Sequence, residues 1–170
     1  MTAKLGDYDL GVAATAVGVG RVTLTQWLTV DRVPDPASFR FSVWDVARLR
    51  IARELIKRGT KVYPAFALQR ARFAVDSTFG EDVASGEAPL VAEKRSPVYM
   101  VVGKDGPDTS GIRLITVPAE DEEATKDVDD AVAQGAVVLL IENLVKDAWY
   151  ALPNLPAEVS LFLDRRRTQL

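Results

Sequence analysis

The sequence predicts an α+β protein, with an all-helical N-terminal part followed by a smaller mixed part. Residues 1–75 place apolar side chains at helical spacing between glycine and proline breaks. Residues 98–170 contain short β-rich runs as well as helical ones, in the order strand, strand, helix, strand, helix. Residues 76–97 mix glycine, proline, serine and threonine, and we expect them to form a linker with little regular structure.

The first two expected helices are short and adjacent. The first covers residues 10–17 and is followed by Gly18, which suits a sharp turn because glycine accepts a positive φ. The second covers residues 21–28, where Leu24 and Leu28 mark one buried face and leave polar residues around it. The order of helix, glycine turn and helix predicts a helix-turn-helix.

Two longer helices are expected next. After two prolines, residues 38–41 are expected to be extended, and Ser42 and Asp45 then form a capping-box pattern that predicts the start of the third helix. Gly59 is expected to end this helix, and Pro64 suits the first turn of a fourth. The third helix carries a basic set, namely Arg48, Arg50, Arg53, Lys57 and Arg58.

A hairpin is expected to open the C-terminal part. Residues 98–102 and 112–117 are β-rich runs, and residues 103–108 between them have the glycine, aspartate and proline content of a loop. The Gly103-Lys104 pair lacks the spacing of a phosphate-binding loop, so we interpret it as part of the hairpin connection.

A helix, a buried strand and a last helix are expected to complete the C-terminal part. Residues 121–134 are amphipathic, and residues 136–141 are continuously apolar, as in a buried strand. The expected inner face of the first helix consists of Ala124, Val128, Ala131 and Val132. Pro156 is expected to open the last helix, with Val159, Phe162 and Leu163 inward and the arginines of 165–167 at its end. Trp149 and Tyr150 are expected to make core or dimer contacts.

The composition argues against several classes of protein. The chain contains neither cysteine nor histidine, so it cannot form a disulfide, a zinc finger or a Ser-His triad from its own residues. We expect no cofactor and no metal, and we expect the acidic residues near 121–130 to be a solvated helix face. The longest apolar run, residues 136–141, is too short to span a bilayer. We expect a cytoplasmic protein that is not an enzyme.

The charges are divided unevenly along the chain. Residues 1–75 hold 12 Lys and Arg and 6 Asp and Glu, whereas residues 76–170 hold 9 and 18. The first part is therefore positive and the second negative, although the net charge is only −3. A basic part joined to an acidic part favours a polyanion as partner of the basic part, with ordinary surface scatter as the alternative.

The helix-turn-helix and the positive charge together predict binding to double-stranded DNA. Glutamine can pair with adenine edges, threonine can contact bases or a thymine methyl group, and arginine can contact phosphates or guanine. The candidate DNA contacts are Arg21, Thr23, Thr25, Gln26, Arg32 and Arg40. A helical hairpin without a ligand is the structural alternative.

Three segments resemble the DNA-binding domain of MerR-like regulators, which phage excisionases and repressors share. They are residues 18–28 (GVGRVTLTQWL), 39–49 (FRFSVWDVARL) and 56–59 (IKRG), within a similarity that covers about residues 8–70. The resemblance implies that residues 21–28 form the recognition helix. It also implies that the turn before Ser42 is a wing that lies along the DNA backbone.

These expectations combine into a two-domain, homodimeric transcriptional regulator. Residues 1–75 would bind DNA as a winged helix-turn-helix, and residues 98–170 would provide dimerisation, partner binding or effector sensing. Three alternatives stay open. They are a phage-type excisionase or packaging protein, an antitoxin-like module whose C-terminal domain binds a protein, and an enzyme in the C-terminal half.

Overall fold

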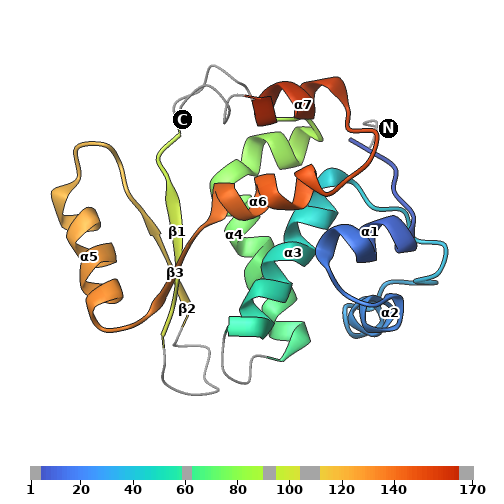
Figure 1. Cartoon of the computed structure of the whole chain (residues 1–170), viewed down its shortest axis with the longest axis horizontal. Coiled ribbons are helices and arrows are strands. Elements are labelled where there is room, and N and C mark those ends of the chain that lie inside the picture. Colours follow the sequence, from blue (N-terminus) through green and yellow to red (C-terminus); the bar gives the residue numbers. More distant parts are fainter. Residues whose placement is uncertain (1–4, 59–62, 90–94, 104–111, 165–170) are drawn as a thin grey trace.

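The predicted α+β class is confirmed. The computed structural model describes residues 5–58, 63–89, 95–103 and 112–164. Within them it contains seven helices and one three-stranded antiparallel sheet. Figure 1 shows α1–α4, α6 and α7 gathered on one side of the sheet and α5 alone on the other side. The sheet therefore separates a helical body from a single outlying helix.

The predicted helix, turn and helix are present. Helix α1 (Leu10–Val17) begins where the Asp9 side chain accepts a hydrogen bond from the Val12 backbone N–H at 2.9 Å. It ends at Gly18, whose φ of 78° lies in the left-handed region that glycine adopts without steric cost. Helix α2 (Arg21–Val30) follows and is two residues longer than expected.

Helix α3 (Val43–Arg58) begins at the predicted capping box. The Ser42 backbone N–H donates to the Asp45 carboxylate at 2.8 Å, and the Asp45 backbone N–H donates to the Ser42 hydroxyl at 3.2 Å. These reciprocal bonds satisfy two backbone donors that the first turn of a helix leaves unpaired. The buried face of α3 includes Val46, Leu49 and Ala52, as the periodicity indicates.

Helix α4 (Pro64–Ser85) extends into the segment that was expected to be a linker. The prediction of little regular structure over residues 76–97 is wrong for 76–85, which are the last ten residues of this helix. Phe79 explains the difference, because its side chain is fully buried and its backbone (φ −131°, ψ 28°) forms a kink next to Gly80. Burial of Phe79 thus outweighs the poor helix propensity of glycine.

The sheet has the strand order β2-β1-β3. Strand β1 (Val98–Val102) pairs antiparallel with β2 (Ile112–Thr116), which confirms the hairpin, and also with β3 (Val137–Leu140). The side chains of Val98, Met100 and Val102 alternate toward the helical body and belong to its core.

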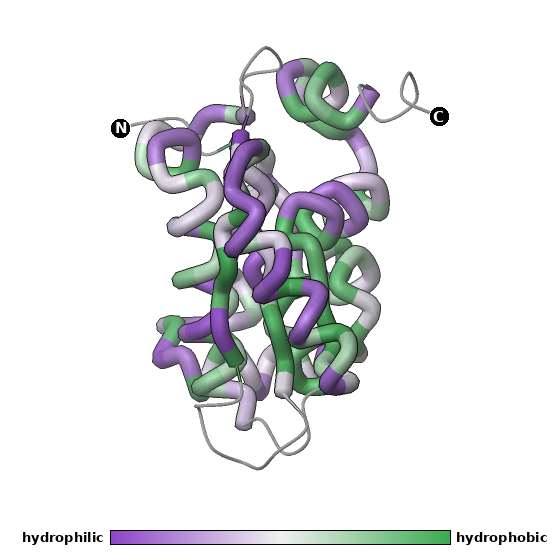
Figure 2. The backbone as a smooth tube through the Cα atoms, turned by 90° about the vertical axis from the view of Figure 1, so that its left-hand side faces the viewer, coloured by the Kyte–Doolittle hydropathy of each residue, from purple (hydrophilic) through white to green (hydrophobic). Residues whose placement is uncertain are grey.

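Helix α5 (Glu122–Ala133) covers the other face of the sheet. Its Ala131 is buried and Ala124 and Val128 are half-buried, but Val132 is 56% exposed, so its predicted inward position is wrong. A single helix on a sheet buries only a narrow strip of its surface, and on α5 this strip is narrower than the predicted inner face. Figure 2 views the molecule from the α5 side, where hydrophilic residues predominate on the nearest segments and more hydrophobic segments lie behind them.

Helix α6 (Ile141–Tyr150) is an element that the sequence analysis did not identify, since it follows β3 without a loop. It joins the C-terminal part to the helical body through Trp149, which is completely buried. The Trp149 indole N–H donates to the Val43 carbonyl at 2.8 Å, and its ring packs edge-on against Trp44 and Phe162. Trp149 is therefore a core residue, which is one of the two roles, core or dimer contact, expected for it.

The last described helix packs against the core. Helix α7 (Ala157–Asp164) buries Val159, Phe162 and Leu163, as predicted. The Tyr150 hydroxyl donates to the Leu163 carbonyl at 2.8 Å, which ties α6 to α7. One core cluster contains residues from both predicted domains. The expectations for Gly59, for residues 104–108 of the hairpin loop and for 165–167 lie outside the described residues.

The expected wing is the turn before Ser42, which lies within residues 31–41, and the structure describes all of these residues. They form turns and bends and no strand, and one isolated bridge joins Phe41 to Tyr8. The winged arrangement therefore stays a prediction. Across the described parts of the chain, no helix is both long enough and apolar enough to cross a lipid bilayer.

Candidate nucleic-acid interface

Helix α2 has one buried side and one exposed edge. Leu24, Trp27 and Leu28 are buried in the core shared with α1 and α3. The opposite side is open to solvent and consists of Arg21, Val22, Gln26, Thr29 and Val30. We call these five residues the α2 edge. An exposed edge on the second helix is what the predicted major-groove recognition requires.

The six predicted contacts are distributed unequally around this edge. Arg21 and Gln26 belong to it, and Thr23 and Thr25 flank it as half-buried residues. Arg32 and Arg40 are exposed on the segment that follows α2. All six are at least partly accessible, and none is buried in the core.

The sequence analysis missed three residues of the α2 edge, namely Val22, Thr29 and Val30. Val22 is 73% exposed and Thr29 is also exposed, so both lie near the centre of the open side. Helical geometry could have found them, because positions 22, 26 and 29 project opposite to the buried Leu24 and Leu28. The apolar Val22 and the methyl group of Thr29 are both suited to contact with thymine methyl groups.

The threonine hydroxyls of α2 have partners within the helix. The Thr25 hydroxyl donates to the Arg21 carbonyl, and the Thr29 hydroxyl donates to the Thr25 carbonyl, both at 2.9 Å. Each hydroxyl oxygen keeps lone pairs that accept hydrogen bonds. The two threonines can therefore accept from base donors while their own protons stay on the helix.

The N-terminus of α2 is compatible with an anion. Its N-cap is Gly20, which supplies no side-chain acceptor, and the first turn contains no acidic residue. Backbone N–H groups at such an end favour phosphate, and the helix dipole adds to this preference. The Arg21 guanidinium lies over α1, where a Cβ atom added to Gly11 would come within 2.2 Å of it. Gly11 thus leaves the space that this guanidinium occupies.

Carboxylates at the start of α1 lie near Arg40 and Arg21. The Arg40 Nε atom is 3.9 Å from an Asp7 carboxylate oxygen, with both side chains mostly exposed. The pKa of Asp9 is lowered, first by the hydrogen bond from the Val12 backbone N–H and to a smaller degree by the charges of Arg40 and Arg21. The positive charges of these two arginines are thus partly balanced by the nearby carboxylates of Asp7 and Asp9.

The basic set of α3 is mainly engaged within the protein. Arg48 lies 3.0 Å from Asp76 and 3.6 Å from Asp45, while Arg53 and Arg58 each reach Glu54 at 2.9 Å. The Arg50 guanidinium donates to the Val17 carbonyl at 3.2 Å and so supports the end of α1. Lys57 is exposed on the same helix. Most of this charge stabilises the helical body and is not presented on the α2 edge.

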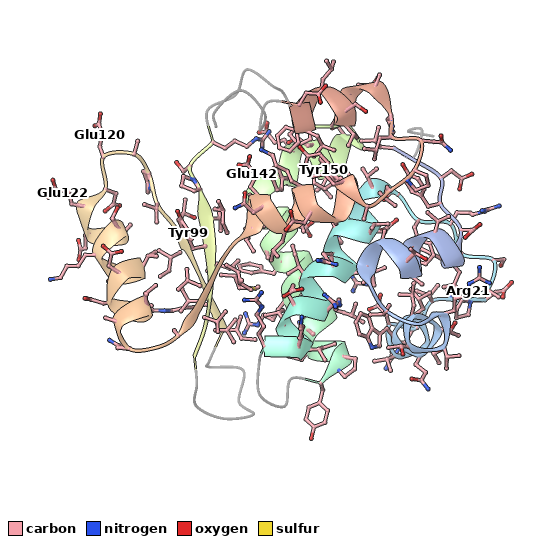
Figure 3. All side chains as sticks on the ribbon, viewed as in Figure 1. Arg21, Tyr99, Glu120, Glu122, Glu142 and Tyr150 are labelled. Carbon is pink, nitrogen blue, oxygen red and sulfur yellow. The ribbon has the colours of Figure 1, made fainter. Side chains whose placement is uncertain are left out.

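The α2 edge and the most acidic segment lie at opposite ends of the molecule. Figure 3 places Arg21 at one extreme of the view and Glu120 and Glu122 at the other. The acidic segment 120–130 holds seven carboxylates and one lysine. A polyanion at the α2 edge therefore approaches the end of the protein that is farthest from its densest negative charge.

The described residues offer no obvious centre for a metal ion, since they contain no group of three or more acidic side chains arranged to hold one. Comparison with known proteins adds no further assignment. Neither a protein-family model, nor a curated protein, nor a solved structure matches this chain.

Proposed function

We propose that this chain binds double-stranded DNA through the α2 edge and acts as a sequence-specific transcriptional regulator. The observation that carries the proposal is the exposure of Val22, Gln26 and Thr29 along one side of the second helix. A free helix edge of this composition fits a major groove about 12 Å wide. Its residues offer amide, hydroxyl and apolar groups, which match the groups on base edges.

The proposed mechanism separates positioning from reading. The N-terminus of α2, with Arg21, contacts phosphates, and Arg32 and Arg40 hold the neighbouring backbone. Gln26, Val22 and Thr29 then read bases. The sign of regulation follows from where the binding site lies relative to a promoter.

The active species is proposed to be a homodimer. One small helix-turn-helix contacts a single half-site, and pairing two copies doubles the contacted surface. The C-terminal part, which carries the sheet and α5, would supply dimerisation or partner binding. Its negative charge keeps this part away from DNA.

Selection of bound fragments from random duplexes, followed by footprinting, tests the proposal with the full chain. We expect an enriched sequence with two related half-sites about one helical turn, 10 to 10.5 base pairs, apart. A footprint in the major groove supports α2 as the reader. Failure to enrich any sequence, or enrichment that Gln26→Ala leaves unchanged, would overturn the proposal. A stoichiometric protein partner in place of DNA would favour the antitoxin-like alternative.

A further inference from the structure

A cavity of about 340 Å³ lies behind the α2 edge. Its walls come from Leu28 of α2, from the segment 31–41, from Leu49 of α3 and from Leu68 of α4. The volume falls within the range of about 300 to 1,000 Å³ that small-molecule sites occupy. The cavity meets α2 at a buried residue and not at its exposed edge, so Arg32 is the one proposed DNA contact that also lines the cavity.

The inner wall of the cavity is apolar. Leu28, Phe41, Leu49 and Leu68 line it and are almost completely buried. Phe39 packs edge-on against Phe41, with ring centroids 4.9 Å apart, and extends this surface outward. Such a wall favours the aromatic or branched aliphatic body of a ligand.

Five of the other lining residues are charged, namely three arginines and two aspartates. Asp31 pairs with Arg72, and Asp45 lies 3.6 Å from Arg48. Arg32 has no ion-pair partner among the residues that the structure describes. Arg48 is also paired with Asp76, so the lining donors that can meet a negatively charged ligand belong to Arg32 and to the part of Arg72 that does not contact Asp31.

Two arginines keep donors for such a charge. Arg72 meets Asp31 through one terminal nitrogen, and a guanidinium has five N–H donors in all. Arg32 lines the cavity, and its backbone adopts the left-handed conformation with a φ of 58°. Left-handed non-glycine residues are strained and are enriched at ligand clamps and switch regions.

We infer that this cavity binds a small organic carboxylate with an apolar body. The carboxylate contacts Arg32 and Arg72, and the apolar body packs on Leu28, Leu49 and Leu68. This assignment goes beyond DNA binding and does not rest on it, because the site is complete without nucleic acid.

Titration of the full chain with phenylacetate tests the inference, with the methyl resonances of Leu28, Leu49 and Leu68 as readout. We expect saturable shifts at these methyls at millimolar concentration and weaker binding of the neutral phenylacetamide. Arg32→Gln and Arg72→Gln should each weaken phenylacetate binding about tenfold, the loss expected for one charge-assisted hydrogen bond. The control Arg113→Gln removes an exposed arginine of β2 and should leave binding unchanged.

The inference is overturned if phenylacetate produces no saturable shift at the three leucines, or if the amide binds as well as the acid. Equal binding by the wild-type chain and Arg32→Gln would also overturn it. Arg32 is exposed and has no ion pair among the described side chains, so its variant should fold even if Arg72→Gln does not. No DNA is present in this experiment, so its outcome is independent of the proposed function.

Discussion

Ser42 shows how one side chain defines the start of an element. Its hydroxyl accepts from the Asp45 N–H and donates to the Asp45 carboxylate at 2.7 Å, while its own N–H donates to the same carboxylate. The residue is buried, so water cannot replace these bonds. We expect Ser42→Ala to lower the free energy of unfolding by about 1 to 2 kcal/mol, measured by urea denaturation. An unchanged midpoint would show that the Ser42 hydroxyl contributes nothing to stability.

Asp9 makes stability depend on pH at the start of α1. Its pKa is lowered in the folded protein, chiefly because its carboxylate accepts the Val12 N–H. A lowered folded pKa means that the ionised carboxylate stabilises the fold above the ordinary aspartate pKa. This contribution is lost as the pH falls through the folded pKa.

We therefore expect the Asp9 carboxyl resonance to titrate below the normal aspartate range. Asp9→Asn, which keeps a capping acceptor, should make stability less dependent on pH in the acid range. A normal titration midpoint for Asp9 would contradict this assignment.

At the scale of elements, the α2 edge carries the functional proposal. We expect Thr29→Ala to lower affinity for the selected duplex without unfolding the protein, because Thr29 is exposed and contributes one local hydrogen bond. A fluorescence anisotropy titration measures the affinity, and circular dichroism checks the fold. The matched control is Thr125→Ala, since Thr125 is also exposed and also bonds a carbonyl four residues earlier, but on α5. Equal losses of DNA affinity for the two variants would contradict the assignment of α2 to the interface.

Local signals made several elements predictable. Gly18, the Ser42 box and Pro64 mark helix ends through backbone geometry, and α1, α3 and the start of α4 lie where these residues indicate. The hairpin pairing followed from two β-rich runs around a loop. In each case the deciding interaction lies within a few residues along the chain.

Other features depend on distant contacts and could not be predicted. The second half of α4 looked like a linker because Gly80 and its polar neighbours lower helix propensity. It is helical because Phe79 enters the core beside Trp44 and Phe162. Likewise, Arg48 of α3 pairs with Asp76 of α4, a contact between distant residues that spacing along the chain does not indicate. The predicted site residues are accessible in the structure, and helical periodicity could also have indicated Val22 and Thr29.

At the scale of the whole molecule, Trp149 joins the two predicted parts into one core. Its ring contacts Trp44 and Phe162, and its N–H reaches the Val43 carbonyl 106 residues away. We expect Trp149→Ala to cost about 3 to 5 kcal/mol. We also expect helix content and near-ultraviolet dichroism to be lost together on heating. Separate transitions for the two parts would show that they fold as independent domains.

Charge separation also operates at this scale. We expect affinity for DNA to fall steeply with salt, and Arg40→Ala to reduce the log–log slope by about 1 through loss of one phosphate contact. Neutralising Glu122 and Glu123 of α5 to glutamine should leave affinity nearly unchanged, because charges beyond a Debye length, about 10 Å at 0.1 M salt, are screened. A strong gain in affinity from the glutamine variant would place α5 next to the DNA.

The most direct measurement is the affinity of wild type, Gln26→Ala and Arg40→Ala for the selected duplex and for each of its single-base variants. If the α2 edge reads bases, Gln26→Ala loses discrimination at one position, by about 1 to 3 kcal/mol. Arg40→Ala then weakens binding to all duplexes alike. Identical effects of the two changes on every duplex, or equal affinity of the wild type for all of them, would contradict the account.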